Sequence, residues 1–306
     1  MRNIYTIGEV VYDIIFKNRA PLNANPGGSM LNTAVSLGRI GLPVSFIGET
    51  GTDKISQIIL DFLSTNNIST KFVEKYQGRN TTVALAFLDS NNDAEYVFHK
   101  DYPQQRLTNP LPIPGKDDIV LFGSSFAITK PVRQKLVGFL ETSKKNGAII
   151  LYDPNFRKQR SDLKDLLPLL EENIQLSDIV RGSDEDFFNI FGLDNTEEIY
   201  TKARALGCQN LIITRNKNGV SLKTASIDTH VDSLSIKPIS TIGAGDNFNA
   251  GLIYSICKKN IKKEGLASIK KTEWEEILGM CVEFSSNVCL SNENYLSIEH
   301  TKSLKF

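Results

Sequence analysis

A glycine-rich run late in the chain carries the strongest local sign of chemistry. It reads Thr241-Ile242-Gly243-Ala244-Gly245-Asp246 and leads into a helix expected from Phe248 to Lys258. Glycines let the backbone approach a ligand closely, and the free N–H groups that begin a helix bind anions. Asp246 is expected either to cap its own helix or to accept a hydroxyl proton while those N–H groups stabilise a transferring phosphoryl group. The run therefore predicts an anion site with a carboxylate beside it.

A second glycine pair, Gly27 and Gly28, enters another expected helix and is followed by Asn32. The Asn32 amide can both donate and accept hydrogen bonds, which suits a ligand that carries hydroxyl groups. On its own, such a glycine pair is more often a tight turn than a ligand-binding site. Asp13 lies in a strand-like apolar run and is expected either to face solvent or to bind sugar hydroxyls.

A third motif, Tyr152-Asp153-Pro154-Asn155-Phe156-Arg157, follows an expected core strand. Open α/β sheets bind their ligands at the carboxyl ends of such strands. Arg157 can pair there with phosphate oxygens, since its guanidinium presents several donors in a fixed plane. The alternative is an arginine on a surface turn formed by the Pro-Asn pair.

Short β-branched runs alternate with longer amphipathic segments, and these elements must position the three motifs. The expected strands are 4–7, 44–47, 119–122, 149–152 and 211–214, and the expected helices are 31–39, 55–66, 132–145 and 196–206. Continuously apolar strands separated by helices are typical of a parallel sheet covered on both faces. The pattern predicts an α/β sandwich formed by a single domain over residues 1–306.

Two segments, about 10–18 and 80–102, break this alternation. In the second, a turn-forming cluster at Ser90–Asp93 separates two strand-like runs, which predicts an antiparallel hairpin. We expect these segments to form a small sheet outside the core. Such a sheet can close over a site as a lid, or its edge can pair with a second copy of the chain to give a homodimer.

The composition excludes several classes of partner. The chain has 306 residues with 35 Lys and Arg against 35 Asp and Glu, so it lacks the excess of positive charge that nucleic-acid binding requires. Its four cysteines have no C-x-x-C spacing, which argues against a zinc site or disulfide framework. No run approaches the roughly 18 apolar residues of a membrane span. We expect a cytoplasmic protein without membrane or nucleic-acid partners.

Taken in order, the three motifs resemble those of the ribokinase-like sugar kinases of the PfkB carbohydrate kinase family. The resemblance spans nearly the whole chain, and Gly-Ala-Gly-Asp at 243–246, with Phe248 and Gly251 after it, is its most specific element. The opening segment 8–13 and the Asp-Pro-Asn-Phe-Arg string are most similar to those of fructokinases.

The resemblance implies a three-layer α/β/α sandwich with a mostly parallel central sheet and a small β-sheet lid. It also implies transfer of the γ-phosphoryl group of ATP to a sugar hydroxyl with Mg²⁺. Asp246 would be the catalytic base, and the backbone of Gly243, Ala244 and Gly245 would form the anion hole beside the nucleotide phosphates. The residues implied to bind the sugar are Asp13, Gly27, Gly28, Asn32 and Arg157, and those implied to bind the nucleotide are Thr214 and Gly219, with Gly243 and Gly245.

The chain departs from the family pattern at three positions. Ser240 replaces an aspartate that helps to bind an activating monovalent cation, which leaves potassium activation open. The family's Asn-x-x-Glu motif aligns with 183–186, so that Asp186 would hold the metal through water. In the nucleotide loop that begins at Thr214, Asn216 takes the place of the first glycine, and asparagine tolerates the left-handed conformation better than most residues.

Fructose is the acceptor that the resemblance favours, with two alternatives. A nucleoside or 2-keto-3-deoxygluconate would keep the chemistry, and Arg79, Lys100 and Arg106 near the expected lid leave an acidic acceptor open. A non-catalytic sugar-binding regulator could also use this scaffold. The presence of both the glycine run and Asp246 argues against that reading, because a sensor needs neither an anion hole nor a base.

Overall fold

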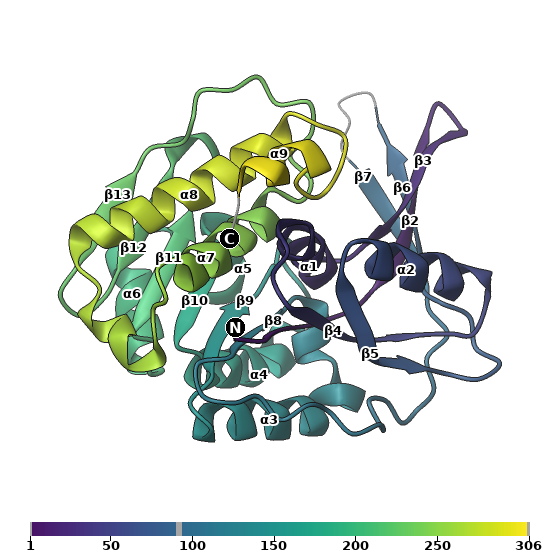
Figure 1. Ribbon diagram of the computed structural model, residues 1–306, viewed down its shortest axis with the longest axis horizontal. Helices are drawn as coiled ribbons and strands as arrows, with labels where there is room; N and C mark the ends of the chain where they lie inside the picture. The colour runs from purple at the N-terminus through teal and green to yellow at the C-terminus, as the bar shows by residue number, and fades with distance from the viewer. Residues whose placement is uncertain (1, 90–93, 305–306) are drawn as a thin grey trace.

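The computed structural model describes residues 2–89 and 94–304, which form two sheets with helices packed around the larger one (Figure 1). The larger sheet has the order β13-β12-β11-β10-β9-β8-β1-β4-β5. Its strands are β1 (Ile4–Ile7), β4 (Val44–Thr50), β5 (Ile68–Lys75), β8 (Ile119–Gly123), β9 (Ile149–Asp153), β10 (Ile179–Ser183), β11 (Asn210–Thr214), β12 (Val220–Lys223) and β13 (Asp228–Val231). Neighbouring strands run parallel from β5 to β11, and β12 and β13 add antiparallel pairs at one edge.

Helices cover both faces of this sheet. One face packs against α1 (Ser29–Ile40), α2 (Lys54–Thr65), α7 (Ala244–Lys258), α8 (Lys271–Cys289) and α9 (Ile298–Ser303). The other packs against α3 (Lys130–Lys145), α4 (Leu163–Leu176), α5 (Asp184–Phe191) and α6 (Thr196–Ala205). Short 3₁₀ turns lie at η1 (Ser125–Ile128), η2 (Asn216–Asn218) and η3 (Lys263–Ser268). The three-layer, ribokinase-like arrangement implied by the sequence is confirmed.

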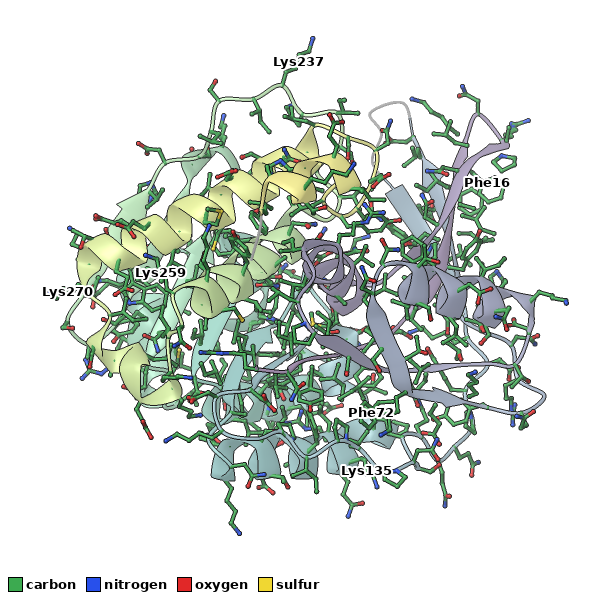
Figure 2. The ribbon with its side chains drawn as sticks, in the orientation of Figure 1. Phe16, Phe72, Lys135, Lys237, Lys259 and Lys270 are labelled. Carbon is green, nitrogen blue, oxygen red and sulfur yellow. The ribbon has the colours of Figure 1, made fainter. Side chains whose placement is uncertain are left out.

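Alternation along the central strands creates two separate hydrophobic cores. In β8, Ile119 and Leu121 point to the core under α1 and α7, whereas Val120 and Phe122 point to the core under α3. Every side chain of β8 is buried. Side chains accordingly fill the space on both sides of the sheet (Figure 2). A strand buried on both faces needs a continuous apolar run, which is the pattern seen in the sequence.

The five predicted core strands and four predicted helices are all present, with ends shifted by a few residues. The helix predicted from Phe248 begins earlier, at Ala244, so that the glycine run forms its first turn. Strand β10 was not predicted, because Arg181 and Gly182 interrupt its short apolar run. These two differences matter, since both elements line the site described below.

The smaller sheet projects from the core beside α1 and α2 and has the order β3-β2-β6-β7 (Figure 1). Its strands are β2 (Val11–Lys17), β3 (Ala20–Gly27), β6 (Val83–Leu88) and β7 (Ala94–His99). The pair β6 and β7 is antiparallel, and the turn predicted at Ser90–Asp93 lies outside the described residues. The sequence did not predict β3, whose Pro21 and Pro26 argue against a central strand; β3 lies at the sheet edge, where proline is tolerated.

The two faces of the smaller sheet differ in character. Asp13 and Tyr96 lie on one face, where the charges of Asp13 and Arg157 act on the Tyr96 hydroxyl. Phe16 and Phe87 stack with ring centroids 5.1 Å apart on the opposite face. Ala84 and Ala86 lie on the face with Asp13 and are buried, so this face packs against the rest of the protein.

None of the helices among the described residues is long and apolar enough to span a membrane.

The packing of α7 against α8 depends on a close approach at Gly251. A Cβ atom there would lie 2.8 Å from the Cα atom of Cys281. We predict that Gly251→Ala lowers the free energy of unfolding by about 1–3 kcal/mol, because overpacking outweighs the higher helix propensity of alanine. Gly279→Ala in α8 is the control: a Cβ at Gly279 has no atom within 4 Å, so this variant should gain about 0.5–1 kcal/mol. Urea denaturation measures both, and an unchanged Gly251→Ala variant would contradict the close packing.

Candidate active site

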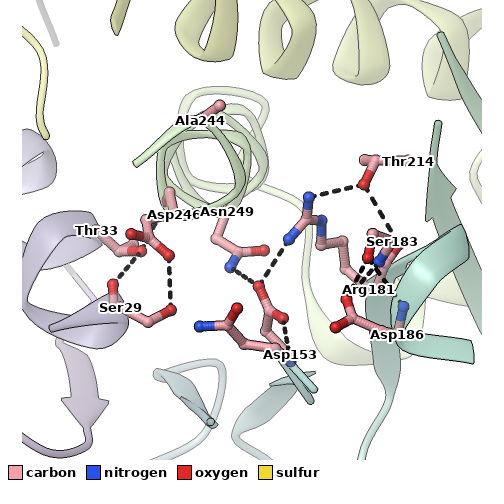
Figure 3. Close-up of polar contacts among 12 residues, drawn as sticks. Ser29, Thr33, Asp153, Arg181, Ser183, Asp186, Thr214, Ala244, Asp246 and Asn249 are labelled. Carbon is pink, nitrogen blue, oxygen red and sulfur yellow. Dashed lines mark hydrogen bonds and ion pairs between the residues drawn. The ribbon is translucent and has the colours of Figure 1, made fainter. Parts of the chain in front are cut away.

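Asp246 lies in the first turn of α7 and is held there by the start of α1. The Ser29 hydroxyl donates to Asp246 Oδ1 at 2.6 Å, and Asn32 Nδ2 donates to Asp246 Oδ2 at 2.8 Å. The Thr33 hydroxyl donates to the Asp246 carbonyl at 2.7 Å (Figure 3). Only 5% of Asp246 is exposed, and these hydrogen bonds hold its two carboxylate oxygens in place. The two glycine motifs, more than 200 residues apart in sequence, thus meet at one carboxylate.

The environment of Asp246 favours proton uptake. Burial raises the pKa of this carboxyl group, opposed by the hydrogen bonds from Ser29 and Asn32 and by the nearby charge of Arg157. A carboxylate whose pKa lies above its ordinary value is a stronger base, which is the requirement for accepting a hydroxyl proton.

The capping role for Asp246 is wrong. The N-cap of α7 is Gly243, in a left-handed conformation with φ 82°, and no side chain caps the helix. Asp246 instead turns away from its own helix to meet α1. The Ala244 N–H donates to the Thr241 carbonyl at 3.3 Å, and no side chain caps the neighbouring N–H groups of this turn, which can therefore bind another acceptor.

Asp153, at the end of β9, joins three elements around the site. Its Oδ2 accepts from Asn249 Nδ2 of α7 at 2.6 Å and from Arg181 Nη1 of β10 at 2.9 Å (Figure 3). Its Oδ1 accepts from the Asn155 backbone N–H at 3.0 Å. Asp153 is 1% exposed, and a buried carboxylate with three donors fixes the elements that supply them. The sequence motifs include Asp153 without indicating a role for it, and Asn249 and Arg181 were not predicted as site residues. A charged residue inside an apolar strand was the available signal for Arg181.

Asp186 lies in the first turn of α5 beside this cluster. Its Oδ2 accepts from the Ser183 backbone N–H and hydroxyl, while its Oδ1 is buried and has no partner among the described residues. Burial raises the pKa of Asp186, and the neighbouring charge of Asp153 raises it further. A buried carboxylate oxygen without a partner, close to a second carboxylate, is suited to bind a cation or a water molecule bound to that cation.

A cavity of about 710 Å³ opens next to these residues. Its walls come from the first turn of α7, the ends of β10 and β11, and α8; they include Arg157, Arg181, Asp186, Thr214, Gly219, Ala244, Gly245 and Cys289. Asn216 has φ 49° and Gly219 has φ 79°, so the loop after β11 keeps its turn with asparagine in place of glycine, as expected. The predicted nucleotide residues therefore share one cavity with the glycine run.

The predicted sugar residues lie at the other side of Asp246. Gly27 ends β3, Gly28 is the N-cap of α1, and Asn32 is 4% exposed with Oδ1 lacking a partner among the described residues. Arg157 is exposed on the rim of the cavity, and its Nε donates to Asn155 Oδ1 at 2.7 Å. The Asp13 carboxylate lies against Gly27, and the charges of Asp13 and Arg157 both act on the Tyr96 hydroxyl.

The three cations near the smaller sheet each have their own carboxylate. Arg79 pairs with Asp101 at 2.9 Å and Lys100 with Glu9 at 2.7 Å. Arg106 pairs with the buried Glu49 at 2.5 Å. An acidic acceptor would have to compete with these carboxylates, so the pairing disfavours that class of substrate.

Residues 1–291 match the profile described as pfkB family carbohydrate kinase. The chain therefore belongs to the pfkB family of carbohydrate kinases, which are phosphotransferases that act on sugar hydroxyls. It is 25% identical over 258 residues to probable fructokinase-4 of Arabidopsis thaliana, covering 80% of this chain and 77% of that protein.

Two solved structures share the fold over nearly the whole chain. A double mutant of the Vibrio cholerae fructokinase, crystallised with fructose, ADP and potassium, has a TM-score of 0.85 at 18% identity, covering 99% of this chain and 98% of that one. The aminoimidazole riboside kinase of Salmonella enterica has a TM-score of 0.81 at 18% identity, covering 99% of both chains.

The burial of Asp13 predicts a measurable pH effect on stability. Burial raises the pKa of Asp13 from 3.8 to about 6, so the stability that protonation of this group contributes is present below about pH 4 and lost as pH rises through 6. Asp13→Asn, neutral at every pH, should be more stable than wild type by about 1–2 kcal/mol at pH 7, with the difference vanishing toward pH 4.

Asp53→Asn is the matched control. At Asp53, burial is outweighed by hydrogen bonds from Thr81 and Ser56, which lower its pKa. The charged form therefore stabilises the fold above pH 4, and this variant should lose stability at pH 7. Urea denaturation across pH 4–8 measures both, and an Asp13→Asn curve parallel to wild type would contradict the burial of the charge.

Proposed function

We propose that the protein is an ATP-dependent fructokinase in which Asp246 is the base. The observation that carries this proposal is the buried Asp246 carboxylate, fixed by Ser29 and Asn32 in the first turn of a helix whose N–H groups have no side-chain cap. A base beside an anion site is the constellation that phosphoryl transfer to a hydroxyl needs.

In the proposed reaction, the acceptor hydroxyl gives its proton to Asp246 as its oxygen attacks the γ-phosphorus of ATP. The bond from that phosphorus to the ADP oxygen breaks on the opposite side. The N–H groups of Gly243, Ala244 and Gly245 take up the charge that develops on the phosphoryl oxygens. Arg157, on the cavity rim, would balance charge near the acceptor or the phosphates.

The sugar would bind between the lid and Asp246. Asn32 supports this placement, because its Nδ2 donates to Asp246 while its Oδ1 has no partner among the described residues and can accept from a sugar hydroxyl. Asp13 would bind further hydroxyls from the lid, over the backbone of Gly27 and Gly28. Lid closure would exclude water, which is smaller than any sugar and would otherwise be phosphorylated.

Thr214 and Gly219 would contact the nucleotide within the cavity. Asp186 would hold Mg²⁺ through water, since its buried Oδ1 has no partner among the described residues. When bound, Mg²⁺ neutralises phosphate charge and thereby supports the transfer.

Fructose is favoured as the acceptor by the fructokinase names among the relatives and by the ion pairing of Arg79, Lys100 and Arg106. The paired cations argue against 2-keto-3-deoxygluconate. A nucleoside acceptor is the alternative that the riboside kinase fold supports. A sugar-binding regulator would leave the buried Asp246 without a purpose.

We also propose a homodimer through the smaller sheet. Its outer face carries Phe16, Phe87 and Val97, with Phe87 and Val97 each 42% exposed. Pairing there would bury this apolar surface and leave the inner face, with Asp13, over the site.

Replacing Asp246 with Asn should abolish fructose phosphorylation. We expect kcat to fall by at least about 10²–10⁴-fold, because the group acts directly on the transferred proton. Fructose affinity, measured by calorimetry, should stay within a few-fold, since Asn can accept from Ser29 in the same place. Asp162→Asn, at a surface pair with Arg160, is the control and should match wild type. Turnover near the wild-type rate in Asp246→Asn would refute the assignment of the base.

Potassium should have little influence on the rate. Ser240 stands in place of the family's cation-binding aspartate, and its Oγ accepts from the Ile242 N–H at 3.2 Å. We predict equal turnover in sodium and potassium buffers for the wild type, and a potassium-dependent rate for Ser240→Asp. Strong potassium activation of the wild type would show that backbone oxygens alone suffice for the cation.

A further inference from the structure

Arg181 occupies a position that the family motifs did not single out. It lies in β10, is 9% exposed, and still reaches the wall of the cavity. A guanidinium group is always charged in proteins, and its burial is costly unless its donors are paired. The surroundings of Arg181 therefore indicate what the charge is for.

Two of its donors are anchored. Nη1 donates to Asp153 Oδ2 at 2.9 Å, and Nη2 donates to Thr214 Oγ1 at 2.8 Å (Figure 3). The guanidinium carbon lies 5.3 Å from the centroid of the Phe248 ring. Asp153 is in turn fixed by Asn249. The guanidinium is thus held in one orientation by β9, β11 and α7.

Other donors are not used. Arginine has five N–H groups, and Nε of Arg181 is buried without a hydrogen-bond partner among the described residues. Thr214 shows the same feature: its oxygen accepts from Arg181, and its proton has only a 3.4 Å contact with the Gly182 carbonyl. Nη1 and Nη2 each carry a second N–H group, so an anion in the cavity that both residues line could accept from Arg181 and from the Thr214 hydroxyl.

The guanidinium also touches the anion site. A Cβ atom on Gly245 would lie 2.8 Å from Arg181 Nη1, so glycine is required there by the close approach of the guanidinium. Gly245 belongs to the first turn of α7, whose N–H groups begin the helix. A phosphate that binds this turn would meet the positive charge of Arg181 at the same time.

We propose that Arg181 is a further catalytic residue, which binds the terminal phosphates of the nucleotide and carries charge on the phosphoryl group during transfer. This inference rests on the proposed kinase function and deepens it. In the step, the bond from the γ-phosphorus to the ADP oxygen breaks, the bond to the sugar oxygen forms, and the hydroxyl proton goes to Asp246. Arg181 stays protonated throughout. Asp153 and Asn249 are positioning residues that act through Arg181 and α7.

The test compares nucleotides that differ only in their terminal phosphates. Calorimetry without sugar measures the affinities of ATP and AMP, each with Mg²⁺, for the wild type, Arg181→Met and Arg181→Lys. We expect Arg181→Met to bind ATP about 10–100-fold more weakly while AMP changes by less than about two-fold, because AMP lacks the β- and γ-phosphates. Arg181→Lys, which keeps the charge without the planar fork, should lie between.

Arg133→Gln controls for the loss of a buried guanidinium group. Arg133 pairs with Glu172 on the α3 and α4 side, and 11% of its side chain is exposed, against 10% for Arg181. This variant should bind ATP and AMP as the wild type does. If Arg181→Met weakens ATP and AMP equally, or neither, Arg181 has only a structural role and the proposal is wrong.

A second readout uses turnover. Arg181→Ala should lower kcat on fructose, and free guanidinium chloride should restore part of it by occupying the vacated space. A wild type that binds ATP but leaves fructose unphosphorylated would refute the fructose assignment, while the ATP and AMP comparison would still decide the role of Arg181.

Discussion

The buried Asp153 carboxylate is the constraint on which the arrangement of the site depends. It lies at the end of a central strand and accepts from the turn at Asn155, from Arg181 of β10 and from Asn249 of α7. Removing one partner of such a buried network leaves unpaired polar groups and typically costs several kcal/mol, about 3–5 for an ion pair. One residue therefore positions the turn at Asn155, strand β10 with Arg181, and the helix that carries Asp246.

A second junction places the acceptor side against the same helix. The start of α1 supplies three donors to Asp246 through Ser29, Asn32 and Thr33, so the Gly-Gly motif and the Gly-Ala-Gly-Asp motif form one unit. α1 and α7 pack side by side on one face of a nine-stranded sheet. This packing brings the two motifs into contact although they lie far apart in the sequence. The fold thus brings the proposed base, the first turn of α7 that carries it and the Asn32 amide of α1 into direct contact.

Sequence reasoning predicted the elements whose pattern is local. The apolar runs at 119–122 and 149–152 form central strands, and the glycine run begins a helix, because burial on both faces and a helix N-terminus each leave a clear signature. The strand with Pro21 and Pro26 was missed, since its pairing depends on a neighbour rather than on its own residues. Arg181 and Asn249 were missed for a similar reason. Their hydrogen-bond acceptors belong to other strands, so the sequence alone does not show that these buried side chains are paired.

The central claim is that this site transfers phosphate from ATP to the hydroxyl of a neutral sugar. It is tested most directly by ADP release with ATP and Mg²⁺ in the presence of fructose, ribose, glucose, 2-keto-3-deoxygluconate, adenosine or inosine, one acceptor at a time. We expect the highest kcat/KM on fructose and no ADP release above background with 2-keto-3-deoxygluconate. Release driven best by the keto-deoxy acid or a nucleoside, or by none of the six, would contradict it.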